Sequence, residues 1–312
     1  MGVALDGDAD VLAVGVYYDQ GFNELNTKIK KSGSVFMLAF DDTDFSNGRV
    51  VSRIGAGYRY NTTRCRGRKC GTFENDFNTQ TEPDLILAKE DHFGRSVSLN
   101  HDGSLLAVGK EKDDGKDNST KDAGAVQLFK FMNGGSIVSA ATGKATYVGT
   151  IGNGYDYLDT SFQNGDKFGT SVAFDKDANR LAATFNDKSS PNTNAKPGAV
   201  NLYTLTADLA SATLIGTIGD GYDAEDEDVD LNSSLDAKDL FGEGVDLNET
   251  GSRLVVSSML ANGRGGNTKN DSGEVILIKF EDNDFTNGSL YGKIGSGSVS
   301  YTHLTLPTIL LV

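Results

Sequence analysis

Short apolar segments alternate with polar turns along nearly the whole chain. The stretch HFGRSVSLNHDGSLLAVG, residues 92–109, holds two apolar segments joined by a turn at Asp102-Gly103. Close variants of it return as FGTSVAFDKDANRLAA at 168–183 and as FGEGVDLNETGSRLVV at 241–256. Short runs of Val, Ile, Leu and Phe between Gly, Asn and Asp turns are typical of β-strands. We therefore expect an antiparallel hairpin at each of these places, closed by a tight turn in which Gly103 supplies a positive φ.

An internal repeat extends this pattern to four units, each with four strand-like segments. The units align on Val3, Val97, Val172 and Val245 in the first segment and on Gly15, Gly109, Thr184 and Ser257 at the end of the second. The third segment begins at Gly33, Gly124, Gly198 and Gly273, and the fourth ends in an Ile-Gly step at Ile54, Ile151, Ile218 and Ile294. Four antiparallel strands that recur at a fixed period are what a propeller blade requires. The sequence predicts an all-β chain, a β-propeller with four blades of four antiparallel strands.

The blades are expected at about 1–58, 93–155, 168–222 and 241–298, with an insertion at 59–92. Residues 299–312 contain VSYTHLTLPT, which resembles a translated sequencing adapter, so we expect a non-native tail there. The alternative is a genuine short tail.

These landmarks resemble the FG-GAP repeats of integrin-α-type β-propellers. The resemblance rests on Phe93-Gly94, Phe168-Gly169 and Phe241-Gly242, on the AVG ends of the second segments, and on the Gly-Ala-Val start of the third. It implies a ring of about seven blades, so four units would form part of a ring whose remaining blades are partners of this fragment. A complete four-bladed ring is the alternative.

The charge balance narrows the range of partners. The chain has 29 basic and 44 acidic side chains, a formal charge of −15, which repels phosphate backbones and anionic lipid surfaces. Nucleic acid is therefore not an expected partner. No run of about 18 apolar residues is present, so we expect no membrane insertion, and the opening segment GVALDGDADVLAVG does not read as a signal peptide.

Calcium is the sharpest candidate chemistry. In the resembled integrin repeats an Asp-rich loop between the first two strands binds Ca²⁺, and Asp6, Asp8 and Asp10 lie in that place. Alternating oxygen ligands suit Ca²⁺, but this loop is shorter than the family's metal loop and lacks its last acidic ligand. Its counterparts carry Asn100, Asp175 and Asn248, which also suit turn formation. A solvated hairpin turn is thus the alternative to a metal site.

A second acidic segment spans residues 220–239 and holds nine carboxylates with a single lysine. Asp226, Asp228 and Asp230 recur at every second position, as at the start of an EF-hand loop, yet the Gly and the closing Glu of such a loop are absent. This segment has two interpretations, a plain solvated loop or a weak Ca²⁺ site. No cofactor is required by either interpretation.

The sequence contains few residues suited to redox or catalytic chemistry. Cys65 and Cys70 are spaced to close a small disulfide loop in an oxidising compartment, with two free thiols as the alternative. His92 and His101 lie at opposite ends of one predicted strand, and His303 lies in the suspected tail. The innermost strands are expected to supply mainly Ser, Val, Leu and Thr. No catalytic residues are therefore predicted, and an enzyme acting in the central channel is the least favoured reading.

The connections point to a binding function. In an antiparallel blade the links between the second and third strands, and those between blades, lie at one end. These are the long ones in every unit, whereas the first turn of each unit is tight. Long loops on a rigid scaffold are a common place for binding. We expect a non-enzymatic, extracellular or cell-surface module that binds protein or glycan, with a purely structural repeat segment of a surface protein as the alternative.

Overall fold

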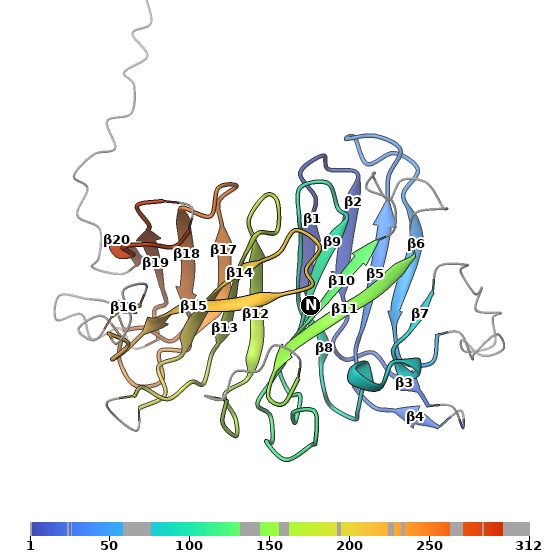
Figure 1. Cartoon of the computed structure of the whole chain (residues 1–312), viewed down its shortest axis with the longest axis horizontal. Coiled ribbons are helices and arrows are strands. Elements are labelled where there is room, and N and C mark those ends of the chain that lie inside the picture. The colour runs from blue at the N-terminus through green and yellow to red at the C-terminus, as the bar shows by residue number, and fades with distance from the viewer. Residues whose placement is uncertain are drawn as a thin grey trace, which may run out of the picture.

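Every sheet predicted from the repeat is present. The computed structural model describes residues 2–23, 25, 27–58, 76–131, 144–155, 162–191, 195–223, 228–231, 235–262, 271–282 and 284–295. Within them, four sheets of mainly antiparallel strands stand in a row (Figure 1). The only helical turns in these residues are two short 3₁₀ segments, η1 (Thr79–Thr81) and η2 (Pro83–Leu85). The all-β prediction is confirmed.

Sheets 1 to 4 follow one another along the chain. Sheet 1 contains β1 (Gly2–Leu5), β2 (Val11–Gly15), β5 (Ser34–Ala39), β6 (Arg49–Gly55) and β7 (Phe77–Asn78), in that order. Sheet 2 contains β8 (Phe93–Leu99), β9 (Leu105–Lys110), β10 (Ala125–Phe131) and β11 (Ala145–Gly152). Sheet 3 contains β12 (Phe168–Phe174), β13 (Arg180–Phe185), β14 (Ala199–Leu205), β15 (Ala212–Gly219) and β16 (Val229–Asp230). Sheet 4 contains β17 (Phe241–Leu247), β18 (Arg253–Ser258), β19 (Glu274–Lys279) and β20 (Ser289–Gly295).

Two sheets gain a fifth strand that the repeat does not predict. After β6 and β15 the chain turns back and adds a two-residue parallel strand, so that Ile54 pairs with Phe77 and Ile218 with Val229. β7 lies within the segment predicted as an insertion, and β16 lies within the acidic segment. A separate two-stranded sheet, β3 (Gly21–Phe22) with β4 (Lys28–Ile29), forms in the first long connection.

The hydrophobic core consists of the interfaces between consecutive sheets. β9 is buried at every position because its alternate residues face different neighbours. Leu106 and Val108 pack into the cluster shared with sheet 1, and Leu105 and Ala107 into the one shared with sheet 3. β2 and β18, in the first and last sheets, instead alternate between buried and more exposed positions. Sheets 1 and 4 therefore each leave one face uncovered.

The innermost strands and the tight turns hold the sheets in line. β1, β8, β12 and β17 lie beside one another in sequence order. Their hairpin turns are joined by main-chain hydrogen bonds: Gly7 N donates to His101 O at 2.7 Å, His101 N to Lys176 O at 2.9 Å, and Lys176 N to Glu249 O at 3.0 Å. We call this end the short-turn face.

Candidate functional site

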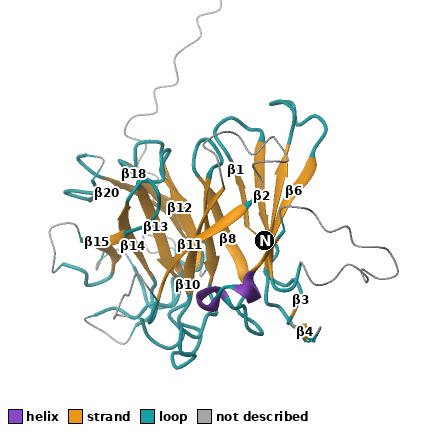
Figure 2. Cartoon of the chain, turned by 45° about the vertical axis from the view of Figure 1, so that its right-hand side comes forward, coloured by secondary structure: helices purple, strands orange, loops and turns teal. Residues whose placement is uncertain are grey.

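The described parts of the long connections lie at the end of the sheets opposite the short-turn face. The helical turns η1 and η2 and the β3-β4 ribbon lie at this end, together with the link from β9 to β10 (Figures 1 and 2). This arrangement follows from the antiparallel order of each sheet, and it confirms the placement predicted from the repeat. We call this end the long-connection face.

A small pocket of about 160 Å³ opens on this face between sheets 1 and 2. One wall is the segment around η2, another is the connection after β9, and the third is the tyrosine after β11. The lining residues are Pro83, Asp84, Ile86, Ala88, Asp91, Asp113, Gly115, Lys116, Asn118 and Tyr155. At the mouth, Lys116 Nζ lies 2.9 Å from Asp84 Oδ1, and the Ile86 side chain is 52% exposed. The pocket thus combines charged, amide, aromatic and aliphatic groups.

A buried lysine lies beside this pocket. Lys110 is 1% exposed; its Nζ lies 3.4 Å from Asp91 Oδ2 and forms an ion pair with Asp113. The Tyr155 hydroxyl donates to the Asp113 carboxylate at 3.2 Å. Buried charges persist when they are paired in this way. The cluster therefore fixes the connection after β9 to the segment before β8.

Burial and charge set the protonation states in this cluster. Burial raises the pKa of Asp91 to about 6, although the charge of Lys110 opposes the shift. Burial lowers the affinity of Lys110 for its proton, but Asp113 and Asp91 more than offset it, so the pKa of Lys110 is raised. Burial also raises the pKa of Tyr155. Lys110 therefore stays an ammonium ion near neutral pH, which suits an anchoring role and not that of a nucleophile or base.

The aspartate in this cluster belongs to a repeated signal that the sequence analysis missed. An aspartate stands two residues before each Phe-Gly step, at Asp91, Asp166 and Asp239, and all three are buried. Each accepts a hydrogen bond from the backbone N–H three residues earlier, at 2.7, 2.9 and 2.8 Å, respectively. In sheet 3, Lys188 Nζ lies 2.9 Å from Asp166 Oδ2, a second buried pair of this kind. These carboxylates close the turn that leads into each innermost strand.

A second polar cluster lies where two innermost strands begin, around Arg95 on β8 and Glu243 on β17. Arg95 on β8 forms ion pairs with Glu243 on β17 and with Glu111, whose Oε2 lies 2.9 Å from Arg95 Nε. Glu111 Oε1 lies 3.0 Å from His92 Nδ1, and Asn186 Nδ2 donates to Glu243 Oε2 at 3.0 Å. Burial of Glu111 is outweighed by its bonds to His92 and Arg95, so the pKa of its carboxyl is lowered.

This cluster borders a cavity of about 240 Å³ between the innermost strands. Its lining includes Ser96, Thr170 and Ser171, as expected, together with Arg95 and Glu243, which were not expected. The pair of Arg95 and Glu243 joins residues 148 positions apart, so no local pattern reveals it. His92 and His101 do not converge: His92 contacts Glu111, and His101 lies near Asp8.

The first group of predicted calcium ligands forms a hairpin turn. Asp6 Oδ1 accepts hydrogen bonds from the backbone N–H groups of Asp10 and Val11, both at 3.0 Å, and burial raises the pKa of Asp6 to about 6. The Asp8 side chain is 65% exposed, with Oδ1 4.0 Å from His101 Nε2. In the other sheets, the backbone N–H five residues on donates to Asn100, Asp175 and Asn248 in the same way. This geometry describes a turn, and Ca²⁺ binding there stays a prediction.

The second group is brought onto sheet 3. Asp228 Oδ1 accepts from Thr217 N at 2.6 Å, and Asp230 Oδ1 accepts from Gly221 N at 2.8 Å. Asp226 lies outside the described residues, as do Cys65 and Cys70, so the weak calcium site and the disulfide stay predictions. Over the part of the chain that the structure describes, no three His, Cys, Asp or Glu side chains gather in a metal-binding arrangement. The same residues contain no helix of the length and apolarity needed to cross a bilayer.

One known family matches part of the chain. Residues 87–129, which hold β8, β9 and most of β10, match the FG-GAP repeat. The four sheets have the strand order of β-propeller blades, and the second of them resembles an FG-GAP repeat. No curated protein matches the chain.

Solved structures with a similar arrangement come from several organisms. A protein from Lactobacillus plantarum has a TM-score of 0.42 and 14% identity, over 91% of this chain and 57% of its own. A functionally unknown protein from Desulfotomaculum acetoxidans has a TM-score of 0.40 and 10% identity, over 95% and 70%. Sqt1 of Saccharomyces cerevisiae has a TM-score of 0.37 and 7% identity, over 94% and 46%. The chain therefore spans a little over half the length of the first of these proteins, and about half of Sqt1.

Proposed function

We propose that the chain is a non-enzymatic binding module that recognises a protein or glycan ligand through its long-connection face. The observation that carries this proposal is the pocket between sheets 1 and 2, which stands on a buried ion cluster. A rigid base with variable loops above it is a common design for recognition surfaces.

The side chains around the pocket suit recognition better than bond breaking. Asp84, Lys116 and Asn118 offer donors and acceptors at the surface, while Ile86 and Tyr155 offer apolar area. A pocket of about 160 Å³ is smaller than the usual 300–1,000 Å³ of a small-molecule site, so it fits one protruding group of a larger ligand. A sugar ring or a single peptide side chain is such a group.

The polar groups that an enzyme would use also favour a binding module over an enzyme. Lys110 is held charged between two carboxylates, and Glu111 is bound to both His92 and Arg95. A general base needs a free acceptor within hydrogen-bond reach of its substrate. In these clusters the carboxylates of Asp91, Asp113 and Glu111 are already engaged by protein donors.

Glycan arrays and immobilised extracellular-matrix proteins test this function. We expect Asp84→Ala combined with Lys116→Ala to weaken binding of a hit at least tenfold. The matched control removes another exposed ion pair, Asp41 with Arg49, whose atoms are 2.6 Å apart in the turn after β5 on the short-turn face. The control should leave binding unchanged. The absence of any hit, or equal loss in both variants, would refute the proposal.

An extracellular or cell-surface location goes with this function. Six Asn-X-Ser/Thr sequons, at Asn61, Asn118, Asn232, Asn248, Asn270 and Asn287, are compatible with secretion. Mass spectrometry of native material should find glycans on the sequons other than Asn118, which lines the proposed binding pocket, or a bond between Cys65 and Cys70. Reduced, unmodified protein would contradict the location.

A purely structural role is the second candidate. It is favoured by the regular joint between consecutive sheets, which needs no ligand. Binding assays that stay negative while the variants above leave folding intact would support it.

A further inference from the structure

Lysine side chains gather on the long-connection face of a chain that is acidic overall. Three backbone hydrogen bonds join the segments that carry these lysines. The donors are the N–H groups of Glu90, His92 and Lys112, and the acceptors are Lys30 O at 2.9 Å, Lys31 O at 3.3 Å and Asp91 O at 3.3 Å, respectively. The segments bring together Lys30 and Lys31 after β4, Lys89 before β8, and Lys112 after β9. Three of these lysines are exposed, and Lys112 is half-buried.

Glu90 is the exposed carboxylate among these lysines. Lys89 Nζ lies 3.5 Å from Glu90 Oε1. The positive charge of Lys89, and then those of Lys31 and Lys112, holds the pKa of Glu90 below its usual value. The neighbouring carboxylates of the buried ion cluster face Lys110 instead of the surface. The surface around Glu90 therefore carries a local excess of positive charge.

This local excess decides the interaction with a ligand that touches the lysines. The formal charge of −15 belongs to the whole chain. At physiological ionic strength the Debye length is about 8 Å, so carboxylates farther away than this are largely screened. The overall charge repels anions at long range, whereas an anionic group in contact with the lysines is attracted.

An exposed tyrosine borders the lysines. Tyr18, in the connection after β2, is 56% exposed, and Lys31 Nζ lies 5.2 Å from the centroid of its ring. The buried His92 ring contacts Tyr18 edge to face, with the ring centroids 5.2 Å apart, and the Tyr17 ring lies 4.3 Å from it. Two other rings thus hold Tyr18 in place, and it offers an apolar surface next to an ammonium group.

We propose that this surface, the lysine patch (Tyr18, Lys30, Lys31, Lys89 and Lys112), binds a sulfated glycan. Sulfate groups contact the ammonium groups, and the apolar face of one sugar ring packs on Tyr18. Clusters of basic side chains are a common site for such polyanions. The patch adjoins the pocket between sheets 1 and 2, because Lys89 follows Ala88 of the pocket lining. The proposal rests on the proposed function, since it names a ligand class for the same face.

The residue types favour a sulfated glycan over other polyanions. Planar carboxylates are best matched by the bidentate fork of arginine, whereas lysine is a point charge on a flexible stem. Arg95, beside Tyr17, is already paired with Glu111 and Glu243. Proteins that bind single-stranded nucleic acid place successive aromatic rings along the strand, and the lysine patch contains one. An acidic peptide and a nucleic acid strand should therefore bind more weakly.

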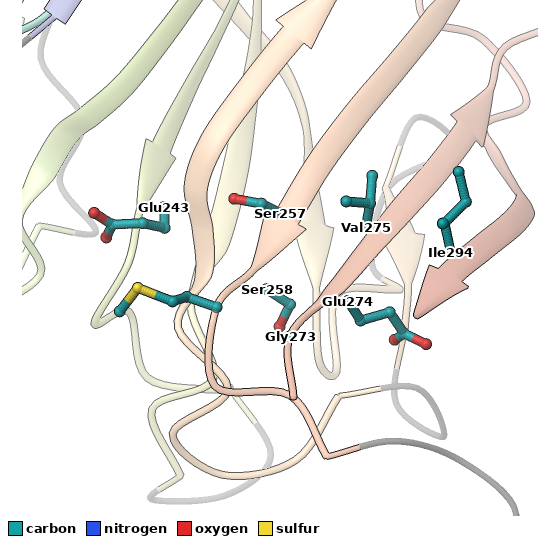
Figure 3. A pocket seen from close by; sticks show the side chains of 8 residues that line it. Glu243, Ser257, Ser258, Gly273, Glu274, Val275 and Ile294 are labelled. Carbon is teal, nitrogen blue, oxygen red and sulfur yellow. The ribbon is translucent and has the colours of Figure 1, made fainter. Parts of the chain in front are cut away.

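A cavity on sheet 4 has the opposite charge. It measures about 340 Å³, and its charged lining groups are Glu243 and Glu274 (Figure 3). Ser257, Val275 and Ile294 complete much of its wall. Carboxylates repel a sulfated ligand, so we expect no competing site at this cavity.

A fluorescein-labelled heparin dodecasaccharide tests the proposal on the full chain. We expect saturable binding by fluorescence anisotropy at about 0.15 M salt, and its loss at about 1 M, where the screening length falls to about 3 Å. Chemically desulfated heparin of the same length should not bind. Tyr18→Ala should weaken heparin binding about three- to tenfold, as expected for the loss of one ring contact.

Two triple variants locate the binding. The lysine-patch variant should weaken heparin binding at least tenfold, and it combines Lys31→Gln, Lys89→Gln and Lys112→Gln. The matched control changes the net charge equally, at three exposed lysines in or near the short-turn face, and should bind as the wild type does. It combines Lys130→Gln, Lys176→Gln and Lys279→Gln. Circular dichroism should show that both variants are folded.

The outcomes separate this ligand class from the proposed function. Equal loss of heparin binding in the two triple variants would overturn the proposal. So would tighter binding of a Glu-rich peptide or a single-stranded DNA oligonucleotide of the same charge. If heparin does not bind, while a neutral glycan or a protein binds the lysine-patch variant and the wild type equally, the sulfated ligand is wrong and the proposed function stands.

Discussion

Replacement of Lys110 by methionine would test the role assigned to the buried ion cluster. The methionine keeps most of the side-chain length but removes the positive charge between Asp91 and Asp113. Both carboxylates are buried, with 4% and 3% of their surface exposed. Breaking a buried pair by removing one partner costs about 3–5 kcal/mol, because the remaining charge is left uncompensated. We expect Lys110→Met to lose this amount of stability at pH 8.

The loss should depend on pH in a defined direction. Asp91 has a folded-state pKa of about 6 in the presence of Lys110, and removal of the cation raises it further. A carboxyl whose folded pKa lies above its unfolded value binds more protons when folded, so its stability contribution is present at low pH and falls as pH rises through the folded pKa. Each unit of further increase adds about 1.4 kcal/mol to the difference between pH 5 and pH 8. The variant should therefore be closer to wild type at pH 5.

Urea denaturation followed by circular dichroism at both pH values measures this effect. Lys121→Met is the control, because Lys121 is exposed and its loss should change stability by no more than about 0.5 kcal/mol. Adding Asp91→Asn and Asp113→Asn to Lys110→Met should recover much of the loss, since no buried charge is then unpaired. A destabilisation that is the same at pH 5 and pH 8, or no rescue, would refute the reasoning.

Two further predictions concern the core and the hairpin turn. Leu106→Asp should strongly lower the urea midpoint, because it loses about 1.5–3 kcal/mol of burial and adds an unpaired buried charge. The control Asp117→Ser, in an exposed loop, should leave the urea midpoint nearly unchanged. Equal effects of the two variants would contradict the sheet assignment. The calcium hypothesis predicts that Ca²⁺ raises the melting temperature of wild type, but not of a variant with Asp8→Asn and Asp10→Asn. A flat titration would leave Asp6 as a turn residue that accepts hydrogen bonds from backbone N–H groups.

The four sheets could be predicted from the sequence because the residues that mark each strand are close together in the chain and recur in every unit. The aligned valines lie where the repeat places them: Val97 pairs with Val108, and Val245 pairs with Val256, across the first hairpin of their sheets. A tight turn and an alternating pattern fix the register of such a hairpin. The third and fourth strands follow from the glycine and Ile-Gly landmarks in the same way.

The remaining features depend on tertiary contacts. The two-residue strands β7 and β16 are too short to show a period, and they form only because an exposed edge of β6 or β15 is available to pair with. The ion pair of Arg95 with Glu243 joins two sheets that are not consecutive. In the sequence, Lys110 resembles an ordinary surface lysine after an apolar run, because only the fold brings Asp91 beside it. Only the aspartate before each Phe-Gly step could have been found from the repeat.

At the joints between consecutive sheets, the backbones of Gly33, Gly124 and Gly198 contact those of Phe93, Phe168 and Phe241, since a Cβ atom at these glycines would lie 1.9, 2.2 and 2.0 Å from a phenylalanine carbonyl oxygen. Where two backbones touch directly, the wedge angle between successive units is set by atoms that every amino acid shares. Substitutions that keep the Phe-Gly step and its facing glycine leave this backbone contact in place, so side chains elsewhere on a sheet can differ without changing the joint.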